Sequence, residues 1–220
     1  MLNQKSNFYK RVKETIIEWF EEHGRDFPWR YDDDPFHVLV AEMLLRRTTA
    51  AAVMRVYPSL LKVAGTPEAL MNLSRRKVES LITPLGLQSV RAKHLQRTAA
   101  ILVERYNGSV KSASSNLENL PGVGRYTACA VRNFAFSIPE PLIDGNIVFF
   151  LNRLFGTDFD GAEDEGAWQF ADNVAGPDHD QRFYWGVIDF VSAICLHKQP
   201  HCKQCPLREN CSFFSERGIR

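Results

Sequence analysis

The chain has 220 residues, of which 45% are hydrophobic and 24% are charged, and its net charge is +1. This composition is typical of a soluble globular protein with one or two compact domains. No apolar run approaches the ~18 residues that a membrane span requires. The charged N-terminal segment shows no secretory signal, so we expect a cytoplasmic protein that does not bind membranes.

The predicted elements are all helices, because apolar residues recur with a period of about 3.6 and no run alternates between apolar and polar residues. The first helix has an apolar face from Phe8 to Phe20 and is expected to stop at Gly24. Asp34 and Pro35 form a strong start signal, a cap followed by a first-turn proline. They predict one helix from Phe36 to about Tyr57.

Further start and stop signals follow along the chain. Thr66 and Ser74 are expected helix N-caps, Pro84 is an expected stop, and a long helix is expected from about Ser89 to Tyr106. The remaining helices are expected near 117, 125–135, 146–155, 163–175 and 179–194.

The nearly neutral total hides a separation of charge along the chain. Residues 35–111 hold 12 basic and 4 acidic side chains, a balance of +8, whereas residues 112–194 have a balance of −8. The basic block could offer one face to a polyanion, and an evenly solvated mixture of signs is the alternative. The residues assigned to this face are Arg46, Arg75, Arg76, Lys77, Arg91 and Lys93.

A glycine-rich turn, Leu-Pro-Gly-Val-Gly-Arg-Tyr, occupies residues 120–126 between two expected helices. Gly122 and Gly124 let the backbone approach a ligand closely, and the following helix N-terminus presents unpaired N–H groups. Such a turn can hold a phosphate but cannot read a base, so it would position a duplex. Taken alone, the pattern could also be an ordinary helix–helix turn.

Four of the five cysteines lie within 17 residues with the spacing Cys-x6-Cys-x2-Cys-x5-Cys. They are Cys195, Cys202, Cys205 and Cys211. This spacing suits a [4Fe–4S] cluster, and a four-cysteine zinc site is the alternative. A disulfide framework is not expected without a signal peptide. The fifth, Cys129, is expected to be a small buried core residue.

The glycine-rich turn, Asp144 eighteen residues after Tyr126, and the cysteine array together resemble the endonuclease III / MutY superfamily of DNA glycosylases. The resemblance covers about residues 27–211. Pro-Trp-Arg at 28–30 and Glu-Met-Leu-Leu-Arg-Arg-Thr-Thr at 42–49 look most like the thymine–DNA mismatch glycosylases of that superfamily.

The resemblance implies an all-α fold of two helical domains. Residues 29–136 would form a six-helix barrel domain with a helix-hairpin-helix motif, and residues 1–28 with 137–220 a domain carrying a C-terminal [4Fe–4S] cluster loop. The expected partner is double-stranded DNA with a mismatched or damaged base. We expect a monomer associated with the nucleoid.

The implied function is a monofunctional glycosylase that excises thymine or uracil mispaired with guanine. Adenine glycosylases typically have Gln-Gln-Thr-Gln where this chain has Arg-Arg-Thr-Thr at 46–49, and usually a further domain, whereas this chain stops nine residues after Cys211. The alternatives are an adenine glycosylase acting opposite guanine or 8-oxoguanine, a glycosylase for another deaminated base such as hypoxanthine, and a non-catalytic iron–sulfur DNA-binding module. Two carboxylates, Glu42 and Asp144, argue against the last.

The resemblance also assigns roles to residues. Asp144, which could otherwise be only a helix cap, would stabilise positive charge on the sugar, and Glu42 would protonate the departing base. Burial should raise the pKa of Glu42, and a purely structural carboxylate is the alternative. Bifunctional relatives have a Schiff-base lysine where this chain has Tyr126, so Tyr126 is expected to line the base pocket. The expected DNA contacts are Gly122, Val123, Gly124 and Arg125, with Arg47 and Leu85 as candidate wedges; a phosphate-binding arginine and a core leucine are the alternatives for the last two.

Overall fold

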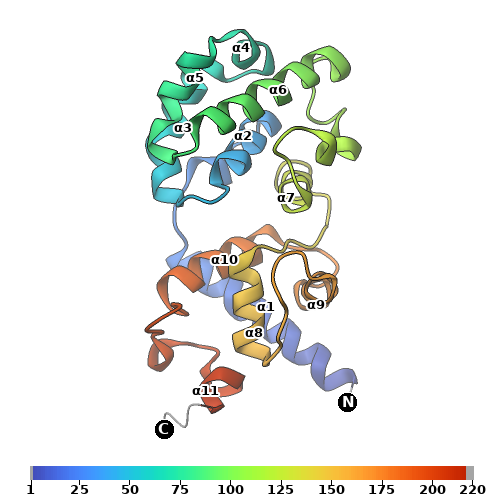
Figure 1. Cartoon of the computed structure of the whole chain (residues 1–220). Coiled ribbons are helices and arrows are strands. Elements are labelled where there is room, and N and C mark those ends of the chain that lie inside the picture. The colour runs from blue at the N-terminus through green and yellow to red at the C-terminus, as the bar shows by residue number, and fades with distance from the viewer. Residues whose placement is uncertain (1, 217–220) are drawn as a thin grey trace. The chain divides into compact units, whose positions relative to one another are not determined.

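The computed structural model describes residues 2–216, and every regular element in this range is a helix, which confirms the predicted all-α class (Figure 1). Contacts between residues divide the chain into two units, one of Phe27–Ile138 and one of Met1–Asp26 with Pro139–Arg220. Each helix in the described range is too short or too polar to cross a membrane.

The unit Phe27–Ile138 consists of helices around one hydrophobic core. Its α-helices are α2 (Pro35–Leu45), α3 (Ala50–Ala64), α4 (Pro67–Asn72), α5 (Arg75–Ile82), α6 (Gln88–Tyr106) and α7 (Arg125–Phe136). Short 3-10 helices span Pro28–Arg30, Thr83–Leu85 and Ser114–Asn119. The long helix α6 packs on α4 and α5, and α7 packs on α2 (Figure 1).

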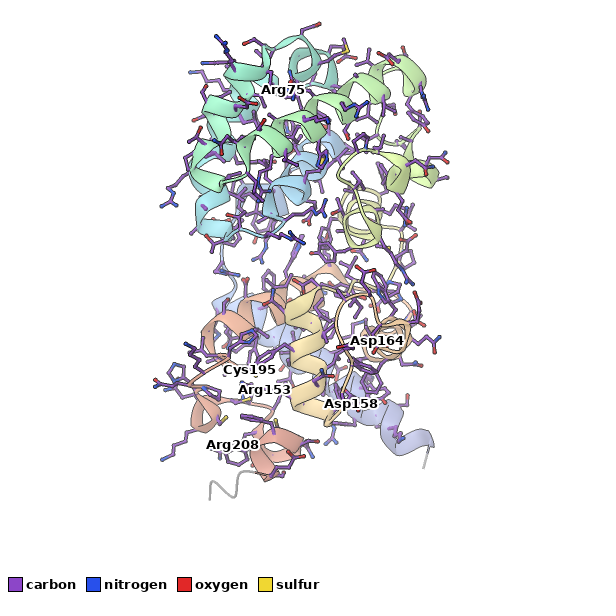
Figure 2. All side chains as sticks on the ribbon, in the orientation of Figure 1. Arg75, Arg153, Asp158, Asp164, Cys195 and Arg208 are labelled. Atoms are coloured by element: carbon purple, nitrogen blue, oxygen red, sulfur yellow. The ribbon has the colours of Figure 1, made fainter. Side chains whose placement is uncertain are left out.

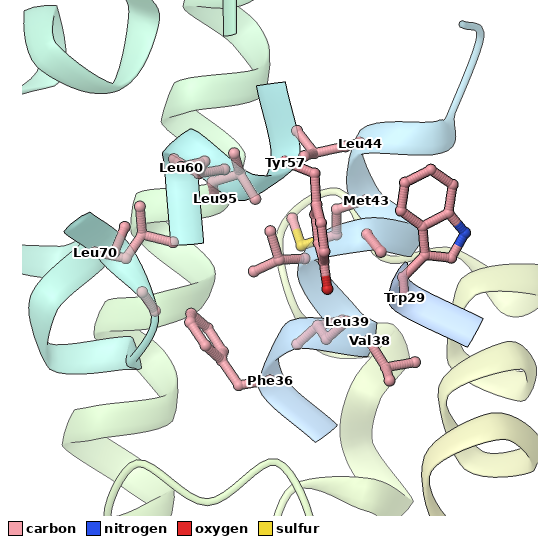
Figure 3. Packing of buried hydrophobic residues seen from close by; sticks show 14 of the residues in the cluster. Trp29, Phe36, Val38, Leu39, Met43, Leu44, Tyr57, Leu60, Leu70 and Leu95 are labelled. Atoms are coloured by element: carbon pink, nitrogen blue, oxygen red, sulfur yellow. The ribbon is translucent and has the colours of Figure 1, made fainter. Parts of the chain in front are cut away.

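Tyr57 of α3 lies near the centre of this core with an exposed fraction of 2% (Figure 3). The indole of Trp29 meets its ring edge-on at 5.4 Å, and the Tyr57 hydroxyl donates to the carbonyl of His37 at 3.2 Å. Burial raises the pKa of Tyr57 above its usual range, and the nearby Asp32 adds to the shift. The hydroxyl is therefore a permanent donor that satisfies a carbonyl of α2 inside an apolar core.

The predicted single helix over residues 36–57 is wrong, because α2 ends at Leu45. Arg91 of α6 supplies the physical reason. Its guanidinium donates to the carbonyls of Leu44 at 3.1 Å and Arg46 at 2.6 Å, which have no further helical turn to accept from. The side chain of Arg91 thus takes the place of the next turn of α2.

The same contacts correct the assignment of Arg91 to the basic surface. Its exposed fraction is only 9%, and burial lowers the pKa of its guanidinium. After the break, Arg47 adopts a left-handed φ of 52°, and the Thr49 side chain accepts from the N–H of Ala52 at 3.2 Å to start α3. The other five residues assigned to the basic surface, Arg46, Arg75, Arg76, Lys77 and Lys93, are exposed.

In the second unit, α1 (Leu2–His23) packs against α9 (Glu165–Ala175) and α10 (Gln181–Ala193), while α8 (Gly145–Phe155) contacts α10 and α11 (Ser212–Glu216). Helices α8, α9 and α10 lie within two residues of their predicted ranges, and α1 ends directly before Gly24, its predicted stop. Directly after α1, the guanidinium of Arg25 donates twice to the buried carboxylate of Asp189, at 2.6 and 2.9 Å. Aspartates cap three of these helices: Asp144 for α8, Asp164 for α9 and Asp180 for α10.

Candidate active site and cysteine loop

The glycine-rich turn leads into α7 with an open helix N-terminus. Gly122 has a φ of +84°, and a Cβ there would lie 2.8 Å from the His94 ring, so only glycine fits. Gly124 is the N-cap residue of α7, has no side-chain cap, and would have open space around a Cβ. Gly124 therefore offers no capping side chain to the N-terminus of α7, an arrangement that suits an anion site.

Neighbouring side chains hold this turn in place. Arg46 donates to the Gly122 carbonyl at 2.6 Å, and Thr98, buried in α6, donates to the Pro121 carbonyl at 2.9 Å. Val123 is buried and its N–H donates to the Leu120 carbonyl at 3.0 Å. Of the hairpin residues predicted to contact DNA, Gly124 and Arg125 are exposed, Gly122 is half-buried and Val123 faces the core.

Asp144 is the N-cap residue of α8 in the second unit. Its Oδ1 accepts from the N–H groups of Asn146 at 2.9 Å and Ile147 at 2.8 Å, while its Oδ2 accepts from the Asn146 side-chain amide at 2.9 Å. Both carboxylate oxygens are thereby oriented. The helix-cap interpretation is correct, and it leaves room for a second role, because Oδ2 accepts only one hydrogen bond and keeps another lone pair.

Two opposing effects act on the Asp144 carboxyl. Burial raises its pKa above the usual aspartate value, whereas the hydrogen bonds from Ile147 and Asn146 favour the charged form. Burial is the larger effect. A carboxylate that is half-buried and oriented in this way interacts more strongly with a developing positive charge than a fully exposed one does.

Glu42 and Tyr126 belong to the unit Phe27–Ile138. Glu42 lies on α2 with an exposed fraction of 5%, among some of the most deeply buried residues of that unit. Tyr126 is half-buried in the first turn of α7, directly after the hairpin. Cys129, one turn further along α7, is buried as predicted.

One candidate wedge lies in the core. Leu85 is only 7% exposed and belongs to the hydrophobic core, which is the environment that the core-leucine alternative describes. Leu87, two residues later, is 62% exposed and has a left-handed φ of 51°. Sequence reasoning missed it. The signal that could have found it is Gly86, which turns the chain and separates a buried leucine from an exposed one.

Exposed Arg47 and Leu87 line the same hollow beside the hairpin. The hollow has a volume of about 240 Å³ and is bounded by the end of α2, the start of α6 and Gly122. Both residues have left-handed backbones, which non-glycine residues adopt mainly at functional or structurally constrained positions. His94 also lines it, and burial lowers the pKa of this histidine with help from Arg46.

The four clustered cysteines surround one small cavity at the end of the second unit. Its other walls are Ile194, Pro200, Arg208, Phe213 and Phe214. The thiols enclose this space rather than meet at one point, since among residues 2–216 no three His, Cys, Asp or Glu side chains are arranged to hold a single metal ion. Burial raises the pKa of the Cys205 thiol to about 12 and shifts those of Cys195 and Cys211 in the same direction.

Comparison with known proteins identifies relatives over nearly the whole chain. The model of the HhH-GPD superfamily base excision DNA repair proteins matches residues 40–169. The thymine/uracil-DNA glycosylase of Pyrobaculum aerophilum is 37% identical over 95% of this chain and 94% of its own length. The thymine-DNA glycosylase of Aeropyrum pernix is also 37% identical, over 93% of this chain and 94% of its own.

Solved structures agree with this result. A thermostable thymine-DNA glycosylase superposes with a TM-score of 0.90 at 30% identity, covering 98% of this chain and all of that one. A trapped covalent intermediate of endonuclease III with DNA superposes with a TM-score of 0.83 at 25% identity, covering 96% of this chain and 98% of that one. The resemblance noted in the sequence is therefore confirmed, and the chain belongs to the HhH-GPD superfamily of base excision DNA repair proteins.

Proposed function

We propose that the protein is a monofunctional DNA glycosylase of base excision repair that removes thymine or uracil mispaired with guanine. The observation that carries this proposal is its similarity, over nearly the full length, to the thymine/uracil-DNA and thymine-DNA glycosylases described above. In this proposal the unit Phe27–Ile138 carries the hairpin that docks on duplex DNA, and the second unit carries Asp144 and the cluster loop.

The three central residues have separate roles in the proposed reaction. The Asp144 carboxylate stabilises the positive charge that develops on the sugar as the N-glycosidic bond breaks. Glu42, buried on α2, delivers a proton toward the departing base. Tyr126 bounds the flipped base and cannot form an imine, so water completes the reaction and leaves an intact abasic site.

A base-release assay tests the substrate directly. Duplexes carrying T:G, U:G, A:G, A:8-oxoguanine or hypoxanthine are incubated with excess enzyme, and the released base is quantified. We expect release of thymine and uracil opposite guanine, because a mispaired base costs less to flip out of the stack. Release from the adenine duplexes alone would make the protein an adenine glycosylase. Release only of hypoxanthine would favour a glycosylase for another deaminated base.

We propose that Leu87 and Arg47 contact the gap that the flipped nucleotide leaves. Leu87→Ala should lower the excision rate about tenfold through weaker flipping, yet change the free energy of unfolding by no more than about 0.5 kcal/mol, since the side chain is exposed. Leu85→Ala is the matched control. It should cost about 2–5 kcal/mol of stability, because it opens a cavity in the core. Thermal unfolding and single-turnover rates of both variants separate the two effects, and a full rate in Leu87→Ala excludes the wedge.

We propose that Cys195, Cys202, Cys205 and Cys211 hold a [4Fe–4S] cluster. The donor set fits this group, because four thiols with the spacing of a single cluster line one apolar-walled cavity. When bound, the cluster supplies four iron–thiolate bonds that tie the loop to α10 and α11. The zinc alternative predicts a colourless protein with one zinc per chain.

Metal analysis distinguishes the [4Fe–4S] cluster from the zinc site. Purified protein should be yellow-brown and contain about four irons per chain, since four cysteines hold such a cube. Cys202→Ser should lose the iron and most soluble yield, whereas Cys129→Ser, at a buried position far along the sequence from the loop, should keep its iron. Stoichiometric zinc without iron in an anaerobic preparation overturns the proposal.

A further inference from the structure

A guanidinium from α8 binds the backbone of the cysteine loop. Arg153 donates through Nη1 to the Leu196 carbonyl at 2.7 Å and through Nη2 to the His197 carbonyl at 2.8 Å. The same Nη1 lies 3.5 Å from the Cys195 carbonyl and 3.8 Å from Cys195 Sγ. Figure 2 shows Arg153 on α8 beside Cys195. One side chain therefore spans three consecutive carbonyls and approaches the first of the clustered sulfurs.

Aromatic rings from two helices contact the same guanidinium. Its Cζ lies 4.2 Å from the ring centroid of Phe149 on α8 and 4.2 Å from that of Phe213 on α11. Phe149 also stacks on His197 of the loop, with ring centroids 3.8 Å apart. A planar guanidinium can lie against aromatic faces while donating along its edge, which a lysine ammonium cannot do. These contacts restrict Arg153 to one orientation.

The backbone of Arg153 takes part as well. Its carbonyl lies 3.5 Å from the sulfur of Cys211, the last cysteine of the array. Arg153 thus touches the loop at its first and last cysteines, Cys195 and Cys211, which are 16 positions apart in the sequence. Arg208, which lines the cavity, donates to the Lys203 carbonyl at 3.1 Å, within the loop itself.

We infer that Arg153 is a positioning residue for the iron–sulfur cluster, which holds the Cys195–His197 backbone in its ligand-bearing conformation and raises the reduction potential of the cluster. The inference rests on the proposed cluster. A reduced cluster carries one more negative charge than the oxidised one, so a fixed cation beside a ligand sulfur stabilises the reduced form more. Hydrogen bonds to the sulfurs act in the same direction.

Two variants separate the charge of Arg153 from its shape. Arg153→Met removes the charge and the hydrogen bonds, while Arg153→Lys keeps the charge but lacks the planar, forked guanidinium that binds the loop carbonyls and lies against the two rings. Arg11→Met is the matched control, because Arg11 is an exposed arginine of the same unit whose guanidinium lies 6.0 Å from the Phe8 ring.

The test uses purified full-length protein under anaerobic conditions. Voltammetry gives the reduction potential, and the fall in cluster absorbance in excess iron chelator gives the rate of cluster loss. Arg153→Met should have a lower potential and lose the cluster several times faster than the wild type. Arg153→Lys should keep a potential close to the wild type but lose the cluster faster, and Arg11→Met should match the wild type in both measurements.

Each result bears on the inference. An unchanged potential and an unchanged loss rate in Arg153→Met overturn it while leaving the proposed cluster intact, whereas a wild type without iron overturns both. If Arg153→Met does not fold, Arg153→Lys decides, since a wild-type loss rate in that variant contradicts the positioning role. If only the reduction potential changes, the positioning role is overturned. If only the rate of cluster loss changes, the effect on the potential is overturned.

Discussion

The variant Asp144→Asn is expected to lose base excision by a factor of about 10² or more, the scale of removing one preorganised charge contact from a transition state. Asparagine retains a side-chain oxygen that can cap α8, where Asp144 accepts from two backbone N–H groups. It carries no negative charge to stabilise the cationic sugar. The loss should therefore fall on the single-turnover rate with a T:G duplex, with nearly unchanged DNA affinity and thermal unfolding.

Asp164→Asn is the matched control. Asp164 caps α9 of the same unit by accepting from the N–H of Gly166 at 2.8 Å, so the substitution makes the same chemical change at the same kind of position. Its excision rate should equal that of the wild type. A near-wild-type rate in Asp144→Asn would place the catalytic carboxylate elsewhere, with Glu42 the first residue to test.

The pKa of Asp144 predicts how the rate depends on pH. The proposed mechanism uses the ionised carboxylate, and burial raises the pKa of this group above the usual aspartate value. As the pH falls, Asp144 is therefore protonated sooner than an ordinary aspartate, and the single-turnover rate should decline at a correspondingly higher pH. The rate is measured with saturating enzyme, so that changes in DNA affinity with pH do not affect it. The residual rate of Asp144→Asn should lack this acidic decline.

The second large effect is expected from Tyr126→Lys. The wild type should leave an intact abasic strand, which breaks only with alkali or heat, and borohydride should trap little enzyme on DNA. The new lysine would occupy the first turn of α7, where the positive end of the helix dipole favours its neutral, nucleophilic form. We expect this variant to form a Schiff base, become trapped by borohydride and cleave the strand.

Tyr126→Phe controls for the loss of the phenol. It adds no amine, so it should show neither trapping nor strand cleavage, whatever its rate of base release. Efficient strand cleavage coupled to base release by the wild type would show that another amine acts, and it would overturn the monofunctional part of the proposal.

Features that depend on neighbouring residues could be predicted from the sequence. The sequence predicts Asp34, Thr66 and Ser74 as N-caps, and each accepts from a backbone N–H two or three positions later. A cap acts within one helical turn, so a few consecutive residues are enough to predict it. The hairpin and the cysteine array can be predicted for the same reason, because each is a short segment with a defined spacing.

Burial and long-range contacts were decided only by the tertiary structure. The break after α2 depends on Arg91, which lies more than forty positions further along the chain. The sequence around α2 therefore cannot predict this contact. Leu85 and Leu87 are the same residue type two positions apart, yet packing buries one and exposes the other. The same holds for Arg153, whose contacts to the cysteine loop join segments that only folding brings together. Sequence alone therefore determined the helical class, the caps and the resemblance to a family, while the fold decided which side chains are free to act, because exposure is a property of the packed chain.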